Sequence, residues 1–354
     1  MISTIAWVEK DREGHARIRI LDQTWLPQTE VFLELTGVPA LSEAIQSLRI
    51  RGAPALGIAG AYGVALAAEQ AAQAAAADPQ EADRCVERAA QEIRAVRPTA
   101  ANLAWGADRT LRRYVDARAR GLDPRGAAAA VLEEARAIHE EDLEASRAMG
   151  KAGVPLVPQG GRVLTHCNTG GLATGGLGTA LAVVFEAAYA GRRPHVFVDE
   201  TRPLLQGARL TAWELQREGI DATLLVDGAA AWLIASQGVD LVLVGADRIA
   251  LNGDTANKVG TYGLALAAAR HRVPFYVVAP SSTFDMSLAS GTEIQVEERP
   301  ADEVRNLGGA PIAPRAIPVW NPAFDVTPAE LIAGWVTDRG ILLPPFAALR
   351  EPPG

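Results

Sequence analysis

Aromatic residues, cysteine and lysine are all scarce in this chain of 354 residues: aromatic residues make up 5% of it, and its cysteines are Cys85 and Cys167. Two cysteines cannot build a disulfide framework, so we expect a protein of a reducing compartment, the cytoplasm. Five scattered histidines and two distant cysteines offer no zinc-ligand spacing. We therefore expect no metal.

The chain also lacks a basic cluster and a long apolar run. Its formal net charge of -8 argues against a nucleic-acid partner, because binding to the phosphate backbone needs concentrated positive charge. A membrane span needs about 20 apolar residues, whereas the uncharged run 52–68 is too short and the run 163–185 is interrupted by polar residues. Charged residues at positions 9–12 follow a short apolar start, which is not typical of a secretory signal. We expect no membrane association.

The length and the 49% hydrophobic content are typical of a globular protein of two domains. In the first half, residues 16–21 and 30–35 cluster or alternate apolar residues, as paired strands do. The later part of this half shows helical patterns separated by proline and glycine breakers. The predicted helices cover residues 40–50, 56–77, 81–96, 101–118 and 124–149. We predict a smaller, mainly helical N-terminal domain, residues 1–149, that starts with short β-strands.

Gly, Pro and Val replace the charged helical pattern at residues 150–161, which places the predicted domain boundary there. The following half alternates short apolar runs with helical segments, a pattern typical of parallel strands buried on both faces. The predicted strands cover residues 163–165, 195–198, 222–226, 241–244 and 275–279. The predicted fold class of residues 150–354 is α/β, a Rossmann-like doubly wound parallel sheet.

Ligands of such sheets lie beyond the carboxyl ends of the strands, and polar segments of this chain follow four of the predicted strands, so they should converge on one edge. Cys167 follows the first of these strands. Near a helix N-terminus its thiol would act as a base or nucleophile, although a lone cysteine is often simply buried. Asp247 follows the strand at 241–244. It suits a general acid, and a solvated capping carboxylate fits its position equally.

Glycines crowd the loop 170–178 behind Cys167. Their backbone amides could cradle a phosphate, and close packing explains them equally well. The loop matches neither the P-loop nor the dinucleotide fingerprint, so neither ATP nor a dinucleotide is expected. We interpret His166 as structural, because neighbouring strand residues point to opposite faces.

Three cations precede candidate helices. Lys258 ends a polar loop, 251–258, before a helix predicted at 260–270, where it would oppose the helix dipole unless an anion binds. Arg51 and Arg97 each lie shortly before a helical pattern. Anion binding and a solvated surface position both remain open for these two arginines.

Taken together, the segments resemble the methylthioribose-1-phosphate isomerase family, in the larger group that includes ribose-1,5-bisphosphate isomerases and regulatory subunits of a translation-initiation exchange factor. The resemblance covers nearly the whole chain. It rests on Arg51-Gly52-Ala53-Pro54-Ala55, Arg97-Pro98-Thr99-Ala100-Ala101-Asn102-Leu103, Thr165-His166-Cys167-Asn168-Thr169-Gly170, Glu200-Thr201-Arg202-Pro203-Leu204-Leu205-Gln206-Gly207, and Gly245-Ala246-Asp247-Arg248 followed by Asn257-Lys258. Ala101 departs from the bulkier apolar residue common there, which puts nothing catalytic in doubt.

The resemblance implies that Cys167 and Asp247 form the catalytic pair, which the regulatory subunits generally lack. It also implies a homodimer of two-domain chains and a small sugar phosphate as substrate, with no cofactor. The substrate-binding residues that it implies are Arg51, Gly52, Ala53, Arg97, Gln206, Asn257 and Lys258.

The implied reaction converts 5-methylthioribose 1-phosphate to 5-methylthioribulose 1-phosphate in methionine salvage. Asp247 would protonate the ring oxygen, and hydrogen would then move from C2 to C1, either through Cys167 as a base or as a hydride. The sequence leaves both routes open. Alternative functions are a ribose-1,5-bisphosphate isomerase, for which no basic cluster offers a second anion site, and a non-catalytic regulatory subunit.

Overall fold

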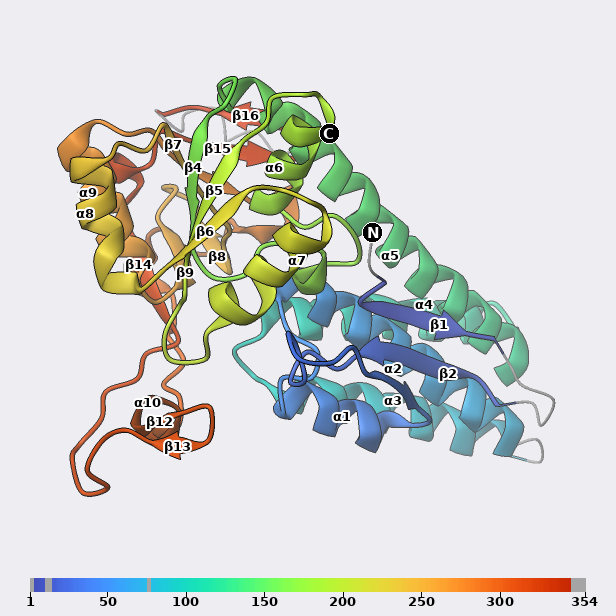
Figure 1. Ribbon diagram of the computed structural model, residues 1–354. Helices are drawn as coiled ribbons and strands as arrows, with labels where there is room; N and C mark the ends of the chain where they lie inside the picture. The colour runs from blue at the N-terminus through green and yellow to red at the C-terminus, as the bar shows by residue number, and fades with distance from the viewer. Residues whose placement is uncertain (1–2, 10–14, 75–77, 345–354) are drawn as a thin grey trace. The chain divides into compact units, whose positions relative to one another are not determined.

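Figure 1 shows the computed structural model, which describes residues 3–9, 15–74 and 78–344. The chain forms two compact units: the first comprises Met1–Glu144 with Gly171–Gly176, and the second Ala145–Gly170 with Leu177–Gly354. The predicted boundary between residues 149 and 150 stays a prediction; it falls within helix α5 (Pro124–Gly153). Residues 10–12 of the charged N-terminal segment and 75–77 of the predicted helix 56–77 lie outside the described residues.

The first unit begins with an antiparallel sheet of strands β1 (Ile5–Val8), β2 (Arg17–Leu21) and β3 (Phe32–Leu35), in the order β1-β2-β3. The predicted pairing of residues 16–21 with 30–35 is confirmed, since Ile18 lies opposite Leu35. Strand β1 was not predicted from the sequence. Ile18 and Ile20 are fully buried and attach the sheet to the core of this unit.

Helices make up the rest of the first unit, and they confirm the predicted helices with ends shifted by a few residues. Small residues let two of them pack backbone to backbone. A Cβ at Gly106 would lie 2.0 Å from the Gly57 carbonyl oxygen, and one at Gly60 would lie 2.5 Å from the Leu103 carbonyl oxygen. The helices are α1 (Val38–Gln46), α2 (Ala53–Ala74), α3 (Pro79–Val96), α4 (Ala101–Ala119) and the first part of α5.

The segment Gly171–Gly176 belongs to the first unit although both of its flanks belong to the second. Thr4 donates its hydroxyl to the Gly171 carbonyl at 2.7 Å, and the Gln23 amide donates to the Leu172 carbonyl at 2.7 Å. The Gly175 amide in turn donates to the Asp142 carboxylate at 2.6 Å. These bonds integrate the segment into the first unit.

The second unit is built on a seven-stranded sheet of order β16-β15-β10-β7-β4-β5-β6, parallel except for β16. The five strands predicted from the sequence are confirmed; β15 and β16 were not predicted. The strands are β4 (Arg162–Thr165), β5 (His195–Asp199), β6 (Ala222–Leu225), β7 (Leu241–Val244), β10 (Phe275–Val278), β15 (Gly334–Thr337) and β16 (Gly340–Leu342).

Alternate residues of the central strands pack on opposite faces, which makes the sheet doubly wound and confirms the predicted α/β class. Val163 and Leu241 share one core with helix α6, whereas Leu164 and Val242 share another with α8 and α9. Side chains that alternate along a strand produce these two cores. The helices of this unit are α6 (Ala180–Tyr189), α7 (Ala212–Arg217), α8 (Ala230–Ser236), α9 (Thr261–His271) and α10 (Ala301–Arg305).

A second sheet has the order β11-β8-β9-β14 and follows the carboxyl end of β7 in the sequence. It corrects the prediction of a polar loop over 251–258, because residues 255–258 form strand β9. The Thr255 hydroxyl accepts from the indole of Trp335 at 3.2 Å, so a polar residue is satisfied inside the strand. The strands are β8 (Arg248–Ala250), β9 (Thr255–Lys258), β11 (Phe284–Asp285) and β14 (Phe324–Thr327), and a separate hairpin joins β12 (Asn306–Leu307) to β13 (Ala310–Pro311).

Among the described residues, none of the helices combines the length and apolar character needed to cross a membrane.

Candidate active site

The loops that carry Cys167 and Asp247 leave neighbouring parallel strands. Leu164 of β4 lies in register with Val242 of β7, and each loop begins at the carboxyl end of its strand. Gly245, which starts the second loop, lies against the first, because a Cβ there would be 2.9 Å from Thr169 Cγ2. The predicted convergence of polar segments at this edge is confirmed.

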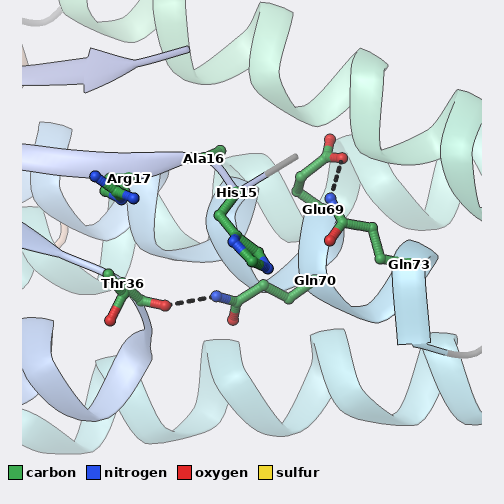
Figure 2. Close-up of a pocket in the computed structure, with 7 residues that line it drawn as sticks. All are labelled: His15, Ala16, Arg17, Thr36, Glu69, Gln70 and Gln73. Atoms are coloured by element: carbon green, nitrogen blue, oxygen red, sulfur yellow. Dashed lines mark hydrogen bonds between the residues drawn. The ribbon is translucent and has the colours of Figure 1, made fainter. Parts of the chain in front are cut away.

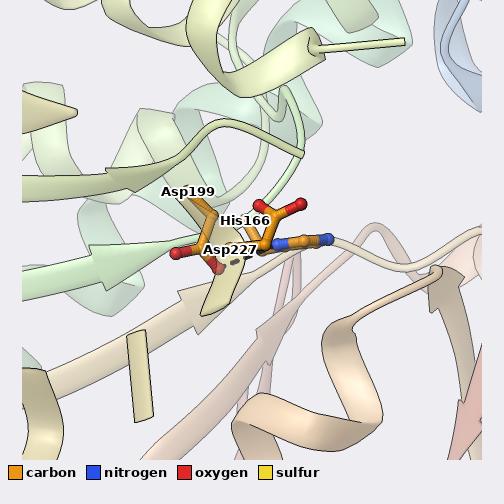
Figure 3. Close-up of side chains that lie close together, drawn as sticks. All are labelled: His166, Asp199 and Asp227. Carbon is orange, nitrogen blue, oxygen red and sulfur yellow. Dashed lines mark hydrogen bonds and ion pairs between the residues drawn. The ribbon is translucent and has the colours of Figure 1, made fainter. Parts of the chain in front are cut away.

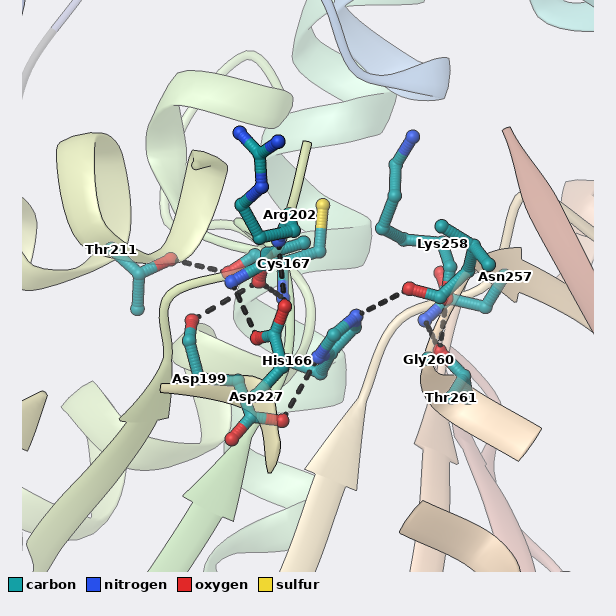
Figure 4. A network of polar contacts seen from close by, with 12 residues as sticks. His166, Cys167, Asp199, Arg202, Thr211, Asp227, Asn257, Lys258, Gly260 and Thr261 are labelled. Atoms are coloured by element: carbon teal, nitrogen blue, oxygen red, sulfur yellow. Dashed lines mark hydrogen bonds and ion pairs between the residues drawn. The ribbon is translucent and has the colours of Figure 1, made fainter. Parts of the chain in front are cut away.

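Cys167 is buried and has a left-handed backbone with φ of 64°. A residue with a Cβ adopts this conformation only when neighbours hold it there. The Cys167 N–H donates to the Thr201 hydroxyl at 2.8 Å, and its carbonyl accepts from the Thr211 hydroxyl at 2.7 Å. In Figure 4 its sulfur extends away from the strands, to the same side as the side chains of Arg202 and Lys258.

The glycine loop behind Cys167 supports the packing interpretation over a phosphate cradle. A Cβ at Gly170 would lie 2.3 Å from the carboxylate of Glu214, and one at Gly178 would lie 2.3 Å from the Thr169 carbonyl. The Asn168 amide donates to Glu214 at 2.7 Å. The protein's own atoms therefore account for these glycines.

Asp247 is half-buried between β7 and β8, and its backbone joins it to β9. Its N–H donates to the carbonyl of Ala256 at 2.9 Å. The next two residues of β9 are Asn257, which is buried and donates to the Thr261 hydroxyl at 3.0 Å, and Lys258. The structure thus brings Asp247, Asn257 and Lys258 onto adjoining backbone.

Lys258 does not face an unoccupied helix N-terminus, which corrects the reasoning from the sequence. The Asp325 carboxylate accepts from the Gly260 N–H at 2.7 Å and from the Tyr262 N–H at 3.1 Å. The positive end of the α9 dipole is therefore already balanced by an acid. The Lys258 ammonium lies 5.3 Å from the centre of the Phe324 ring, within cation–π range.

Gln206 is buried, with 6% of its surface exposed, and directly precedes the short π-helix Gly207–Thr211. Its side-chain carbonyl oxygen has no hydrogen-bond partner among the described residues. A buried acceptor without a hydrogen bond costs free energy, and short π-helical segments occur often at functional sites. Both features are expected of a residue that meets a ligand.

Arg51, Gly52 and Ala53 lie in the first unit, at the start of α2. Arg51 is half-buried, and its Nε donates to the side chain of Gln23 at 3.0 Å. Gly52 has φ of 94°, and a Cβ there would lie 2.5 Å from the Ala173 carbonyl oxygen. Glycine is therefore required at this position by backbone conformation and by packing alone.

Arg97 directly follows α3 and lies shortly before α4, so it precedes a helix as predicted but also stands at the C-terminal end of another. Helix α4 begins at Ala101, after a turn in which the Ala100 N–H donates to the Arg97 carbonyl at 2.9 Å. A cation is favourable at a helix C-terminus, so this position calls for no anion.

His166, Asp199 and Asp227 place one possible metal-ligand atom each within 4.8 Å of one another (Figure 3). Their hydrogen bonds favour a polar network over a metal site. Asp227 accepts from the N–H groups of Thr201 and Arg202, both at 2.7 Å. His166 Nδ1 lies 2.9 Å from the Asp199 carboxylate and Nε2 lies 2.9 Å from the Val259 carbonyl, so both ring nitrogens already have protein partners. The sequence predicted that the segments carrying these residues converge and that His166 is structural, but not the hydrogen bonds that join them.

The first unit holds a separate pocket of about 240 Å³, shown in Figure 2. The Gln70 amide donates to the Thr36 carbonyl at 2.6 Å, and the Gln73 amide donates to Glu69 at 3.1 Å. The pocket is lined by His15, Ala16, Arg17, Thr36, Glu69, Gln70 and Gln73, so no candidate residue among those described lines it.

Comparison with known proteins gives the family. Residues 49–344 match the model described as the initiation factor 2 subunit family. The chain belongs to this family. The chain is similar to a methylthioribose-1-phosphate isomerase of Pelotomaculum thermopropionicum. The two are 50% identical over 349 residues, which cover 98% of this chain and 92% of the relative.

Two solved structures that are similar to this chain carry different names. The 5-methylthioribose 1-phosphate isomerase from Pyrococcus horikoshii OT3 superposes with a TM-score of 0.89 at 40% identity, covering 99% of this chain and 94% of the other. A translation initiation factor eIF-2B, subunit delta, from A. fulgidus superposes with a TM-score of 0.86 at 40% identity, covering 98% of both chains. The family name alone therefore does not define an activity.

Proposed function

We propose that the chain is a methylthioribose-1-phosphate isomerase of methionine salvage, which converts the aldose 1-phosphate to the ketose 1-phosphate. The observation that carries the proposal is the 50% identity, over nearly its whole length, to a relative of that name. The placement of Cys167 and Asp247 on loops of neighbouring strands supports it.

The chemistry requires an acid and a route for hydrogen. Phosphate on the anomeric oxygen locks the sugar ring, so a group must protonate the ring oxygen while its bond to C1 breaks. Asp247 serves as this acid in our proposal, and Cys167 either carries the proton from C2 to C1 or orients substrate for a hydride shift. Substrate and product are isomers, so the balanced reaction needs no external oxidant or reductant.

The proposed substrate-binding residues offer groups suited to different parts of a sugar phosphate. Lys258, Arg51 and Arg97 are cations suited to phosphate. The unpartnered oxygen of Gln206 suits a sugar hydroxyl, which would donate to it. The remaining proposed substrate-binding residues are Gly52, Ala53 and Asn257. We also propose a homodimer located in the cytoplasm.

A side-by-side assay with methylthioribose 1-phosphate and ribose 1,5-bisphosphate tests the proposal. We expect turnover of the first sugar only. Preferential turnover of the bisphosphate would make the chain a ribose-1,5-bisphosphate isomerase. No turnover of either sugar, with assembly into a hetero-oligomer, would favour the non-catalytic role suggested by the name of the A. fulgidus relative.

A further inference from the structure

A buried histidine bridges three segments of the second unit, directly beside Cys167 in the sequence. The His166 side chain is 1% exposed, and its Nδ1 lies 2.9 Å from the Asp199 carboxylate at the end of β5. Its Nε2 lies 2.9 Å from the carbonyl of Val259, the residue after Lys258. We propose that His166 is a buried imidazolium and a positioning residue, which fixes the Lys258 end of β9 against the Cys167 loop.

The hydrogen-bond partners account for both ring protons. A backbone carbonyl only accepts, so Nε2 must donate. Our proposal assigns Asp199 the ionised form, whose carboxylate only accepts, so Nδ1 donates as well. The second oxygen of Asp199 has no hydrogen-bond partner among the described residues, which leaves His166 to compensate that buried charge. A buried carboxylate without such compensation would be costly.

Among the described residues, the charged groups that act on the ring are acidic. They are Asp199 on β5, Asp227 after β6 and Asp325 on β14. Burial alone would lower the pKa of His166, but the hydrogen bond and charge of Asp199, aided by the Val259 carbonyl and by Asp227, raise it above its ordinary value. Electrostatics and geometry therefore agree on the charged ring.

The ring acts on the turn after Lys258 more than on Cys167 itself. Gly260 has φ of 111°, and a Cβ there would lie 2.7 Å from His166 Cε1, so the ring packs directly against this turn. The backbone of Cys167 is held independently by Thr201 and Thr211. Figure 4 shows the ring between the Cys167 loop and the Lys258 segment. Loss of the ring should therefore weaken substrate binding more than it slows the chemical step.

Nitrogen NMR of protein labelled in its five histidines tests the protonation state without any activity. We expect one ring to stay doubly protonated at pH 8, and its signal to vanish in His166→Gln. In Asp199→Asn the pKa of the same ring should fall, because burial lowers it and the Asp199 charge no longer opposes burial, so the doubly protonated signal should be lost at pH 8. This variant keeps the test open if the first one does not fold. A His166 ring that is neutral at pH 7 would overturn the proposal.

Kinetics test the positioning role, and this readout rests on the proposed isomerase function. His166→Gln should raise KM for methylthioribose 1-phosphate about tenfold, the cost of a lost charge-assisted hydrogen bond, with a smaller fall in kcat. The matched control is His195→Gln, at the amino end of β5, which should change neither value. An unchanged KM in folded His166→Gln would overturn the positioning role. A wild-type chain without turnover but with the charged ring would instead contradict only the proposed function.

Discussion

The two units bury different kinds of side chain. The core of the first unit is almost entirely aliphatic and alanine-rich, and its helices approach through glycines such as Gly57 and Gly106. The second unit combines two apolar cores with buried polar residues gathered at the carboxyl edge of its sheet. These include His166, Asn168, Asp199, Thr201, Gln206, Thr211, Glu214 and Asn257.

This difference separates two sources of order. In the first unit, steric fit between backbones fixes the arrangement, and a single added methyl group disturbs it. At the edge of the second unit, directional hydrogen bonds fix individual residues, so a substitution there should change chemistry before it changes folding. Substitutions in each unit can test the contrast.

The largest effect is expected from Asp247→Asn, which keeps the shape of the side chain and removes the proposed proton donor. Loss of a general acid typically lowers the rate by about 100- to 10,000-fold. The measurement is kcat, with circular dichroism to show an intact fold. The matched control is Asp240→Asn, at the amino end of the same strand β7, which should retain kcat. Near-normal turnover in Asp247→Asn would remove it from the mechanism.

A steric test of the first unit is Gly106→Ala. Its Cβ would lie 2.0 Å from the Gly57 carbonyl oxygen, so helices α2 and α4 must separate. We expect the free energy of unfolding to fall by about 1–3 kcal/mol, measured with urea. Gly263→Ala in α9 is the control, since its Cβ would meet no neighbouring group of the described chain within 4 Å. Removing a helical glycine there should stabilise by about 0.5–1 kcal/mol, and equal losses in both variants would contradict the steric account.

Asp142 should make stability depend on pH. Burial raises the pKa of Asp142 from 3.8 to about 6, although the Gly175 N–H bond opposes the shift. The folded state thus binds the proton more tightly than the unfolded state, so this contribution is complete below about pH 4 and is lost as pH rises to about 6. The free energy of unfolding of Asp142→Asn, measured with urea, lacks this loss. Relative to wild type it should therefore rise by about 2 kcal/mol as pH increases from about 4 to about 6. A constant difference would refute the assignment.

The smallest effect is expected from Thr201→Val, which removes the acceptor of the Cys167 N–H and leaves the fold of the sheet in place. We expect kcat to fall about tenfold, equivalent to about 1.4 kcal/mol, with little change in KM. Thr201→Ser keeps the hydroxyl and should restore kcat. A loss of the same size in both variants would point to packing of the methyl group instead.

Periodic apolar patterns in the sequence predicted the helices of the first unit and five of the seven strands in the main sheet of the second, because burial enforces those patterns directly. Strand β9 escaped prediction because most of its residues are polar yet satisfied inside the protein, as Thr255 is by Trp335. The Cys167 and Asp247 loops were predictable from strand order. The capping of helix α9 by Asp325 was not predictable, because 65 residues separate Asp325 from the Gly260 amide that it binds.

The placement of Gly171–Gly176 in the first unit has a consequence for synthesis of the chain on the ribosome. After residue 144 has emerged, the nascent first unit still lacks acceptors for Thr4 and Gln23 and the donor for Asp142. It can complete its hydrogen bonds only after strand β4 has been made. N-terminal regions usually fold first during translation, but here the first unit must wait for part of the second. A gene fragment ending at residue 144 would accordingly encode a unit without its last segment.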